Sequence, residues 1–205
     1  RRLAPLMEND KRKINLMYAM LLSLPGTPVL YYGDEIGMGD NIYLGDRNGV
    51  RTPMHWNQNI NAGFSNCKPS RLYAPIIMDP EYNYNSINVE AQMNNPNSLY
   101  NSLKNMIKVR KKYEIFGNSR INFLYPENKK ILAFILENDS EKMLCVYNLS
   151  KTSQPVEIDL SFLKGYTPYE ILCDVKFPSI GDLPYFLTPN PYGYYWFNLL
   201  PIALE

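Results

Sequence analysis

The sequence predicts an α/β segment over residues 1–116, followed by an all-β antiparallel sandwich over residues 117–205. Two observations support this order. In the first part, apolar residues recur at helical spacing on both sides of one short, continuously apolar run. After Gly117 the pattern changes to short β-type runs separated by turns. Because strands that follow an α/β pattern usually pack as a separate layer, we place the domain boundary near Phe116–Gly117.

The first helix is expected to begin after Asn9–Asp10, which can cap it, and to end before Pro25–Gly26. Its apolar positions recur at helical spacing: Ile14, Met17, Tyr18, Leu21 and Leu22. A strand, Pro28 to Tyr32, follows almost at once and is apolar on both faces. Such a strand is typical of a parallel sheet covered on both sides, so this pair forms the α-to-β half of an α/β repeat.

A long polar stretch, Gly33 to Pro96, separates that strand from the next helix. Loops of this length inside a compact domain are usually functional, and we interpret this one in that way. The second helix is expected to start at a cap on Asn97 or Ser98 and to run to about Tyr113. Basic residues in its last turns suit the negative end of the helix dipole.

The second part contains the expected strands. They are Ile121 to Tyr125, Ile131 to Glu137, Lys142 to Asn148, Val156 to Leu160, Glu170 to Cys173 and Tyr194 to Leu199. In the last of these, about half of the aromatic side chains must face the core, because side chains alternate along a strand.

One parallel strand cannot form a sheet alone. The first part is therefore interpreted as the terminal strand and helices of a (β/α)8 TIM barrel whose other strands are not included. In such barrels the chemistry takes place at the carboxyl ends of the strands, which places the loop after Tyr32 at an active-site face.

Composition excludes some classes of function. The net charge is +1, with basic and acidic residues interleaved, which argues against a nucleic-acid or polybasic membrane surface. No apolar run approaches the roughly 20 residues that span a bilayer.

Cys67, Cys145 and Cys173 lack zinc-site spacing and are expected to be reduced in a cytoplasmic protein. The start at Arg1–Arg2, without Met, suggests a processed or excised segment. The 17 tyrosines suit sugar surfaces and half-buried strands alike.

Arg51 is the main candidate for ligand binding. Its guanidinium can donate to two neighbouring sugar hydroxyls or to a carboxylate, and Thr52–Pro53 would present it from a stiff turn. The alternative is a structural ion pair with Asp46, Asp34 or Glu35, and both interpretations stay open at this point.

Other candidates are weaker. Asp34 and Glu35 could suggest the paired carboxylates of a glycosidase, but adjacent side chains point in different directions. His55 lacks a nucleophile or metal-ligand partner, so we expect it to pack or to form a hydrogen bond. The loop glycines resemble a phosphate cradle only superficially, because no P-loop lysine follows them.

Several segments resemble a known family. GTPVLYYGDEIGM, residues 26–38, resembles the eighth-strand region of the α-amylase superfamily of glycoside hydrolases. GVRTPMHW, residues 49–56, resembles the RTPMQW segment of its exo-acting and isomerising branch. More narrowly, YLGDRNGVRTPM, PIIMDPEYNYNSINVEAQ and LPYFLTPNPYGYYWFNL are similar to the trehalose synthase family, the maltose α-D-glucosyltransferases. This resemblance covers nearly the whole chain.

The resemblance implies a retaining mechanism that interconverts maltose and trehalose, with three catalytic carboxylates on earlier barrel strands and none in this chain. Arg51 matches the arginine that binds the glucose to be transferred, and Asp46 and Arg47 are expected to shape a rim that excludes water. His55 stands where the family carries Gln. A calcium site is expected upstream. The segment alone is expected to be inactive. Its expected partners are the rest of the barrel and, in the full-length enzyme, a second copy of that enzyme. A maltokinase is a further possible partner.

Two alternatives remain. One keeps the superfamily but changes the reaction, to that of an α-glucosidase or a sucrose isomerase. The other is a non-catalytic carbohydrate-binding or assembly module, which exposed aromatic platforms on the sandwich would favour.

Overall fold

The computed structural model describes residues 1–202, so the last residues of the predicted sandwich, with Leu204–Glu205, lie outside the described residues. The chain divides into two compact units. The first combines Arg1–Asn15 with Val29–Lys104, and the second combines Leu16–Pro28 with Asn105–Glu205. The boundary near Phe116–Gly117 stays a prediction.

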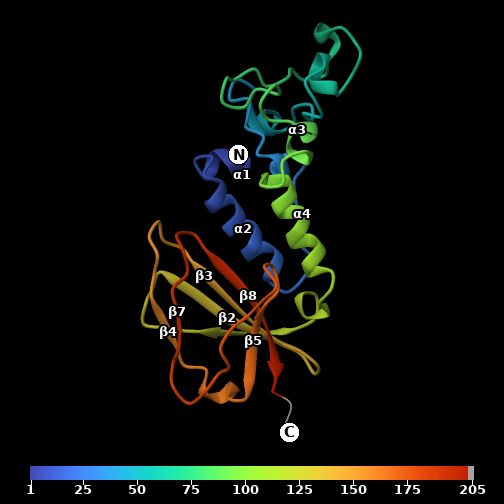
Figure 1. Cartoon of the computed structure of the whole chain (residues 1–205). Coiled ribbons are helices and arrows are strands. Elements are labelled where there is room, and N and C mark those ends of the chain that lie inside the picture. Colours follow the sequence, from blue (N-terminus) through green and yellow to red (C-terminus); the bar gives the residue numbers. More distant parts are fainter. Residues whose placement is uncertain (203–205) are drawn as a thin grey trace. The chain divides into compact units, whose positions relative to one another are not determined.

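The second unit contains the antiparallel sandwich (Figure 1). Its larger sheet has six strands in the order β1-β2-β3-β8-β5-β6. Their bounds are β1 Arg120–Leu124, β2 Ile131–Glu137, β3 Lys142–Asn148, β8 Tyr194–Pro201, β5 Tyr166–Glu170 and β6 Val175–Lys176. Two further strands, β4 (Val156–Ile158) and β7 (Tyr185–Leu187), pair into a small sheet. The predicted all-β second part is confirmed.

One predicted strand is displaced. The sequence pattern placed a strand at Glu170 to Cys173, whereas β5 ends at Glu170. The Glu170 carboxylate accepts hydrogen bonds from the backbone N–H groups of Leu172 and Cys173, at 3.1 and 2.6 Å. This cap turns the chain out of the strand. The short strands β6 and β7 were not predicted, because two or three residues carry too little periodicity to detect.

The sandwich core is built from alternating side chains of both sheets. Val156 and Ile158 of β4, with Tyr185 and Leu187 of β7, face the core, while the middle residue of each strand is exposed. On β8 both Trp196 and Phe197 are fully buried, because one faces each side of a sheet that is covered on both faces. The sequence pattern predicted that about half of the β8 aromatic residues face the core, whereas the full burial of both neighbours shows that the second face of this strand is covered as well.

A buried polar chain lies beneath the larger sheet. The Trp196 indole Nε1 donates to the Tyr147 hydroxyl at 3.0 Å, and that hydroxyl donates to Ser23 Oγ. Ser23 Oγ in turn donates to the Met20 carbonyl at 3.0 Å. Burial raises the pKa of Tyr147 well above its usual value, so the phenol stays protonated and can act as a donor. The side-chain polar atoms of Trp196, Tyr147 and Ser23 therefore all have hydrogen-bond partners.

Both predicted helices form. Helix α2 (Lys11–Ser23) begins after Asp10, whose carboxylate accepts the Arg12 N–H at 2.9 Å. Helix α4 (Leu99–Arg110) begins after Ser98, whose hydroxyl accepts the Asn101 N–H at 3.1 Å. Helix α4 ends at Arg110, earlier than predicted. Two shorter helices are α1 (Leu3–Leu6) and α3 (Val89–Met93).

The strand predicted at Pro28 to Tyr32 is not formed, and Val29 is 82% exposed. A strand requires a partner for its N–H and C=O groups, and within residues 1–202 no other strand pairs with this run. The long stretch that follows holds only short helices. They are η1 (Asp34–Ile36), η2 (Asp46–Val50), η3 (Ile60–Gly63), η4 (Pro69–Arg71) and α3. Two other short helices are η5 (Glu114–Phe116) and η6 (Ser161–Leu163).

Candidate substrate-binding site

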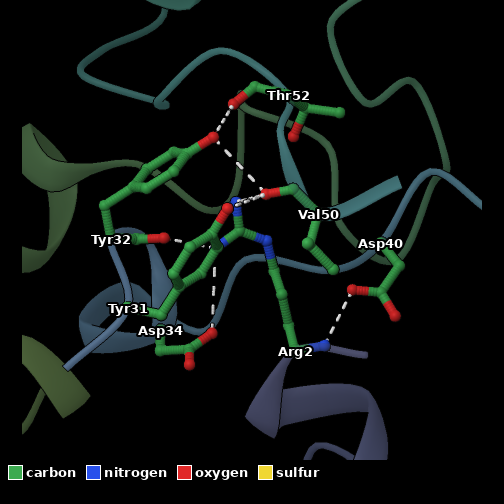
Figure 2. A network of polar contacts seen from close by, with 7 residues as sticks. All are labelled: Arg2, Tyr31, Tyr32, Asp34, Asp40, Val50 and Thr52. Atoms are coloured by element: carbon green, nitrogen blue, oxygen red, sulfur yellow. Dashed lines mark hydrogen bonds and ion pairs between the residues drawn. The ribbon is translucent and has the colours of Figure 1, made fainter. Parts of the chain in front are cut away.

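Arg2 lies at the centre of the polar network in the first unit, although the sequence pattern did not single it out. It is 1% exposed. Its guanidinium donates to the Tyr32 carbonyl through Nη1 and to the Val50 carbonyl through Nη2, the latter at 2.9 Å. Nη1 also lies 3.7 Å from the Asp34 carboxylate, and the Arg2 backbone N–H donates to Asp40 (Figure 2). One buried cation thus joins three segments of the unit.

The rings of Tyr31 and Tyr32 complete this network. The Arg2 guanidinium lies 5.3 Å from the centroid of the Tyr31 ring and 4.9 Å from that of the Tyr32 ring, within the range of cation–π attraction. The Tyr31 hydroxyl donates to the Val50 carbonyl at 3.2 Å, and the Tyr32 hydroxyl donates to the Thr52 carbonyl at 2.8 Å (Figure 2). The backbone carbonyls of the residues before and after Arg51 are therefore held in place.

Gly33 allows the cation to come this close. Its φ of +87° lies in the left-handed region, and a Cβ at this position would lie 2.8 Å from Arg2 Nη1 and 2.5 Å from Met38 Sδ. Any larger residue would push against the buried guanidinium. The glycine after Tyr32 is thus required by packing as well as by backbone conformation.

Arg51 differs from Arg2 in having an exposed side chain. Among residues 1–202 its guanidinium makes no ion pair and no hydrogen bond, so the predicted alternative of a structural ion pair with Asp46, Asp34 or Glu35 is not formed in this structure. A free guanidinium on a fixed backbone is a preorganised donor, because a ligand need not displace an existing partner.

Arg51 and Glu35 line the same cavity, of about 340 Å³. This volume lies within the usual range for small-molecule sites. Four of the lining residues carry exposed aromatic rings: Tyr32, Trp56, Phe64 and Tyr73. Flat apolar rings beside a cation and a carboxylate suit a ligand with apolar faces and polar edges.

His55 is buried, and it lies in the chain between Met54 and Trp56, which line this cavity. Its Nδ1 lies 3.0 Å from the Ile87 carbonyl, and its own carbonyl accepts the Val89 N–H at the start of α3. Asn88 caps that helix by accepting the Ala91 N–H at 2.8 Å. Desolvation lowers the pKa of His55, so the ring stays neutral. The expected packing and hydrogen-bonding role of His55 matches this geometry.

Asp34 and Glu35 occupy different environments. The Asp34 carboxylate is largely buried beside Arg2, and its pKa is raised because desolvation outweighs the attraction of that guanidinium. Glu35 is half-buried at the cavity wall. Asp34 lies beside Arg2 whereas Glu35 lines the cavity, so the two carboxylates do not form a pair across one ligand site. This agrees with the expectation that two adjacent acidic residues are weak evidence for a catalytic pair.

Asp46 and Arg47 are exposed on η2 and do not line the cavity. Asp46 has a positive φ of 53°, a conformation that favours Asp or Asn among residues with a side chain. Their predicted role at the rim stays a prediction.

Sequence reasoning missed part of this site. Trp56, Phe64 and Tyr73 line the cavity, and Arg2 holds its backbone, but none was chosen as a site residue. Trp56 closes the recognisable RTPMHW segment, so its position could have been noticed. Arg2 could not have been, because only the fold brings it next to Val50.

Residues 1–202 hold no group of three or more His, Cys, Asp or Glu side chains that could bind a metal ion. No helix within these residues has the length and apolar character needed to cross a membrane. Cys67, Cys145 and Cys173 are free in this structure.

Comparison with known proteins identifies the class. Residues 1–119 match the α-amylase catalytic domain family, and residues 121–196 match the maltogenic amylase C-terminal domain family. The chain therefore belongs to the α-amylase family. More specifically, it is 50% identical over 203 residues to a trehalose synthase of Pimelobacter sp. (strain R48), covering 97% of this chain and 35% of that protein.

Two further comparisons agree. The chain is 42% identical to a trehalose synthase of Thermus thermophilus, covering 98% of this chain and 21% of that protein. It superimposes on an isomaltulose synthase mutant of Erwinia rhapontici NX5 with a TM-score of 0.72 at 20% identity, covering 97% of this chain and 41% of that one. The chain thus spans about a third or less of the two trehalose synthases. The predicted fold class, a barrel end followed by a β-sandwich, is confirmed.

Proposed function

We propose that this chain is part of a retaining intramolecular glucosyltransferase that interconverts maltose and trehalose. The 50% identity to a trehalose synthase over 97% of the chain supports the proposal. In the structure, the proposal depends on Arg51, whose unpaired guanidinium is presented from a fixed backbone into a cavity with an aromatic rim.

The proposed reaction proceeds in two steps. An aspartate attacks the anomeric carbon of maltose while a glutamic acid protonates the leaving glucose, which gives a glycosyl-enzyme and free glucose. The glucose then turns and attacks through its anomeric hydroxyl, which returns its proton to the glutamate and gives trehalose. We place these carboxylates, and a third aspartate that steadies the ring, outside this chain. Asp34 forms an ion pair with Arg2, and neither Asp34 nor Glu35 takes part in bond cleavage.

Arg51 binds the glucose that is transferred, by donating to adjacent hydroxyls or to a carboxylate that also contacts them. The aromatic rings of Trp56, Phe64 and Tyr73 cover the apolar faces of the sugar. Asp46 and Arg47 act farther out, at the rim, where they limit the entry of water. Since water competes for the same glycosyl-enzyme, exclusion favours isomerisation over hydrolysis.

The 205-residue chain alone is proposed to be inactive, because it lacks the nucleophile and the acid. A maltokinase partner, self-association of the enzyme and an upstream calcium site remain predictions. Maltose turnover by the isolated chain would contradict the proposed division of the active site.

Arg51→Ala in the intact enzyme tests the central claim. Loss of a charge-assisted hydrogen bond costs about 1.5–3 kcal/mol, so kcat/KM for maltose should fall about 10- to 150-fold. Arg71→Ala is the matched control, since Arg71 is an exposed arginine of the same unit that does not line the cavity. A change of less than twofold in Arg51→Ala would exclude the binding role.

Product analysis separates the alternatives. Maltose should give mainly trehalose with the wild-type enzyme. Glucose as the main product would indicate an α-glucosidase instead, and turnover of sucrose with no turnover of maltose would indicate a sucrose isomerase.

A further inference from the structure

Arg2 does not line the substrate-binding cavity and is 1% exposed, so it can act on a ligand only through other residues. A buried cation loses its hydration, and proteins usually compensate with a close ion pair and hydrogen bonds. The carboxylate paired with Arg2, that of Asp34, lies 3.7 Å from Nη1, which is too far for a hydrogen bond. The guanidinium donates instead to the carbonyls of Tyr32 and Val50. Its donors are therefore directed at the backbone that carries the site.

The peptide group that joins Val50 to Arg51 is hydrogen-bonded at both ends. Its carbonyl accepts from Arg2 Nη2 at 2.9 Å and from the Tyr31 hydroxyl at 3.2 Å. Its N–H donates to the Asn48 carbonyl at 3.0 Å. Because a peptide group is planar, these bonds fix the orientation of its plane. That plane sets the direction in which the Arg51 side chain leaves the backbone.

Arg2 also acts on the other side of Arg51, through Tyr32. The guanidinium donates to the Tyr32 carbonyl and lies 4.9 Å from the centroid of the Tyr32 ring. The hydroxyl of that ring donates to the Thr52 carbonyl at 2.8 Å (Figure 2). Tyr32 and Arg51 line the same cavity. One buried side chain thus supports the backbone before Arg51, the backbone after it and one of the rings beside it.

The geometry requires a guanidinium at this position. Nη1 and Nη2 donate to two different carbonyls, those of Tyr32 and Val50, and a rigid planar fork can serve both at once. An ammonium is a compact point charge on a flexible stem and does not reproduce that fork. The guanidinium also has little room to shift, since a Cβ at Gly33 would lie 2.8 Å from Nη1.

We propose that Arg2 is a positioning residue, which sets the affinity of the enzyme for maltose by holding the backbone from which Arg51 reaches into the cavity. Among residues 1–202 the Arg51 guanidinium has no hydrogen bond or ion pair of its own, so its direction depends on its backbone. A displaced Arg51 weakens a contact that maltose and the transition state share, which raises KM more than it lowers kcat. The choice of maltose as ligand rests on the proposed function.

Arg2→Lys in the intact enzyme is the first variant of the test. It keeps a positive charge beside Asp34, so the unit should fold, but it lacks the fork. KM for maltose should rise about threefold or more, and kcat should change by less than about twofold. Loss of folded enzyme lowers kcat and leaves KM unchanged, so a merely structural role would not raise KM. Arg1→Lys is the matched control, because it makes the same change at the exposed neighbour, and its KM should equal that of the wild-type enzyme.

A double-mutant cycle then shows whether Arg2 acts through Arg51. In an enzyme that already carries Arg51→Ala, Arg2→Lys should lower kcat/KM no further, because the side chain to be positioned is missing. Tyr31→Phe is a milder second variant, since it removes one donor to the Val50 carbonyl and keeps the ring beside Arg2. Tyr31 does not line the cavity. This variant should raise KM about twofold, again only while Arg51 is present.

Two results would overturn the inference. An unchanged KM in folded Arg2→Lys would show that Arg2 supports the fold alone, and Tyr31→Phe decides in the same way if Arg2→Lys does not fold. Losses in kcat/KM that multiply in the double variant would show that Arg2 acts independently of Arg51. A wild-type enzyme that hydrolyses maltose, or that turns over sucrose instead, would contradict the proposed function alone, and the same cycle is then measured with that substrate.

Discussion

Replacement of Arg2 by methionine should destabilise the first unit, because methionine fills a similar volume but cannot donate. The change removes the donors to the Tyr32 and Val50 carbonyls and leaves Asp34 without its cation. Hydrogen bonds that involve a charged group contribute about 1.5–3 kcal/mol each, and breaking a buried ion pair costs about 3–5 kcal/mol. The Val50 carbonyl keeps the Tyr31 hydroxyl, at 3.2 Å. We therefore expect the free energy of unfolding to fall by about 3 kcal/mol, at the lower end of the range for breaking a buried ion pair.

The assay is urea unfolding of the 205-residue chain followed by ¹⁹F NMR after labelling with 5-fluorotryptophan. The chain has two tryptophans, Trp56 in the first unit and Trp196 in the second, so the two signals can be read separately. The Trp56 transition should move to lower urea in Arg2→Met. Arg1→Met is the matched control, since Arg1 is the exposed neighbour and should change stability little. If both variants unfold at the same urea concentration, the network around Arg2 does not stabilise the unit.

The same variant has a consequence for the ionisation of Asp34. Burial raises the pKa of Asp34, and the charge of Arg2 opposes that rise. Without Arg2 the Asp34 pKa should rise further, which ¹³C carboxyl titration can measure. Because the folded state then binds a proton more readily than the unfolded state, stability increases as the pH falls through the folded-state pKa. The cost of Arg2→Met should therefore be smaller at acid pH than at neutral pH, and an equal cost at both would refute the electrostatic part of the reasoning.

The remaining predictions concern two buried residues. Burial lowers the pKa of His55, so the folded state resists a proton that the unfolded state takes up below about pH 6.5. The free energy of unfolding should therefore fall as the pH drops through that value. His55→Gln should reduce this fall, which urea titrations at several pH values measure. The same slope of stability against pH in the two proteins would contradict the prediction. Tyr147→Phe leaves the Trp196 N–H and Ser23 without their partner and should cost about 1–3 kcal/mol in thermal or urea unfolding. The exposed Tyr125→Phe is its control, and a cost equal to that control would show that the buried polar chain adds no stability.

Local chemistry made several features readable from the sequence. Asp10 and Ser98 mark helix starts because their oxygens accept N–H groups only two or three residues away. Strands β2 and β3 match their predicted bounds because each is a short, mainly apolar run that ends at polar turn residues, a pattern contained within the run itself. Arg51 could be chosen because its charge and the following Thr52–Pro53 are neighbours in the chain.

Long-range contacts decided the rest. The run from Pro28 to Tyr32 has the composition of a buried strand, but a strand forms only where another strand pairs with it, which sequence composition cannot supply. Arg2 is separated from Val50 by 48 positions, so its hydrogen bond to the residue before Arg51 follows from the fold alone. In the sandwich, the pairing of Glu157 with Phe186 likewise depends on the register between two short strands. The sequence by itself determined the segment types, the helix starts and the main candidate residue. Tertiary structure determined which side chains hold the backbone around Arg51 and which rings share its cavity, because those contacts join residues far apart in the chain.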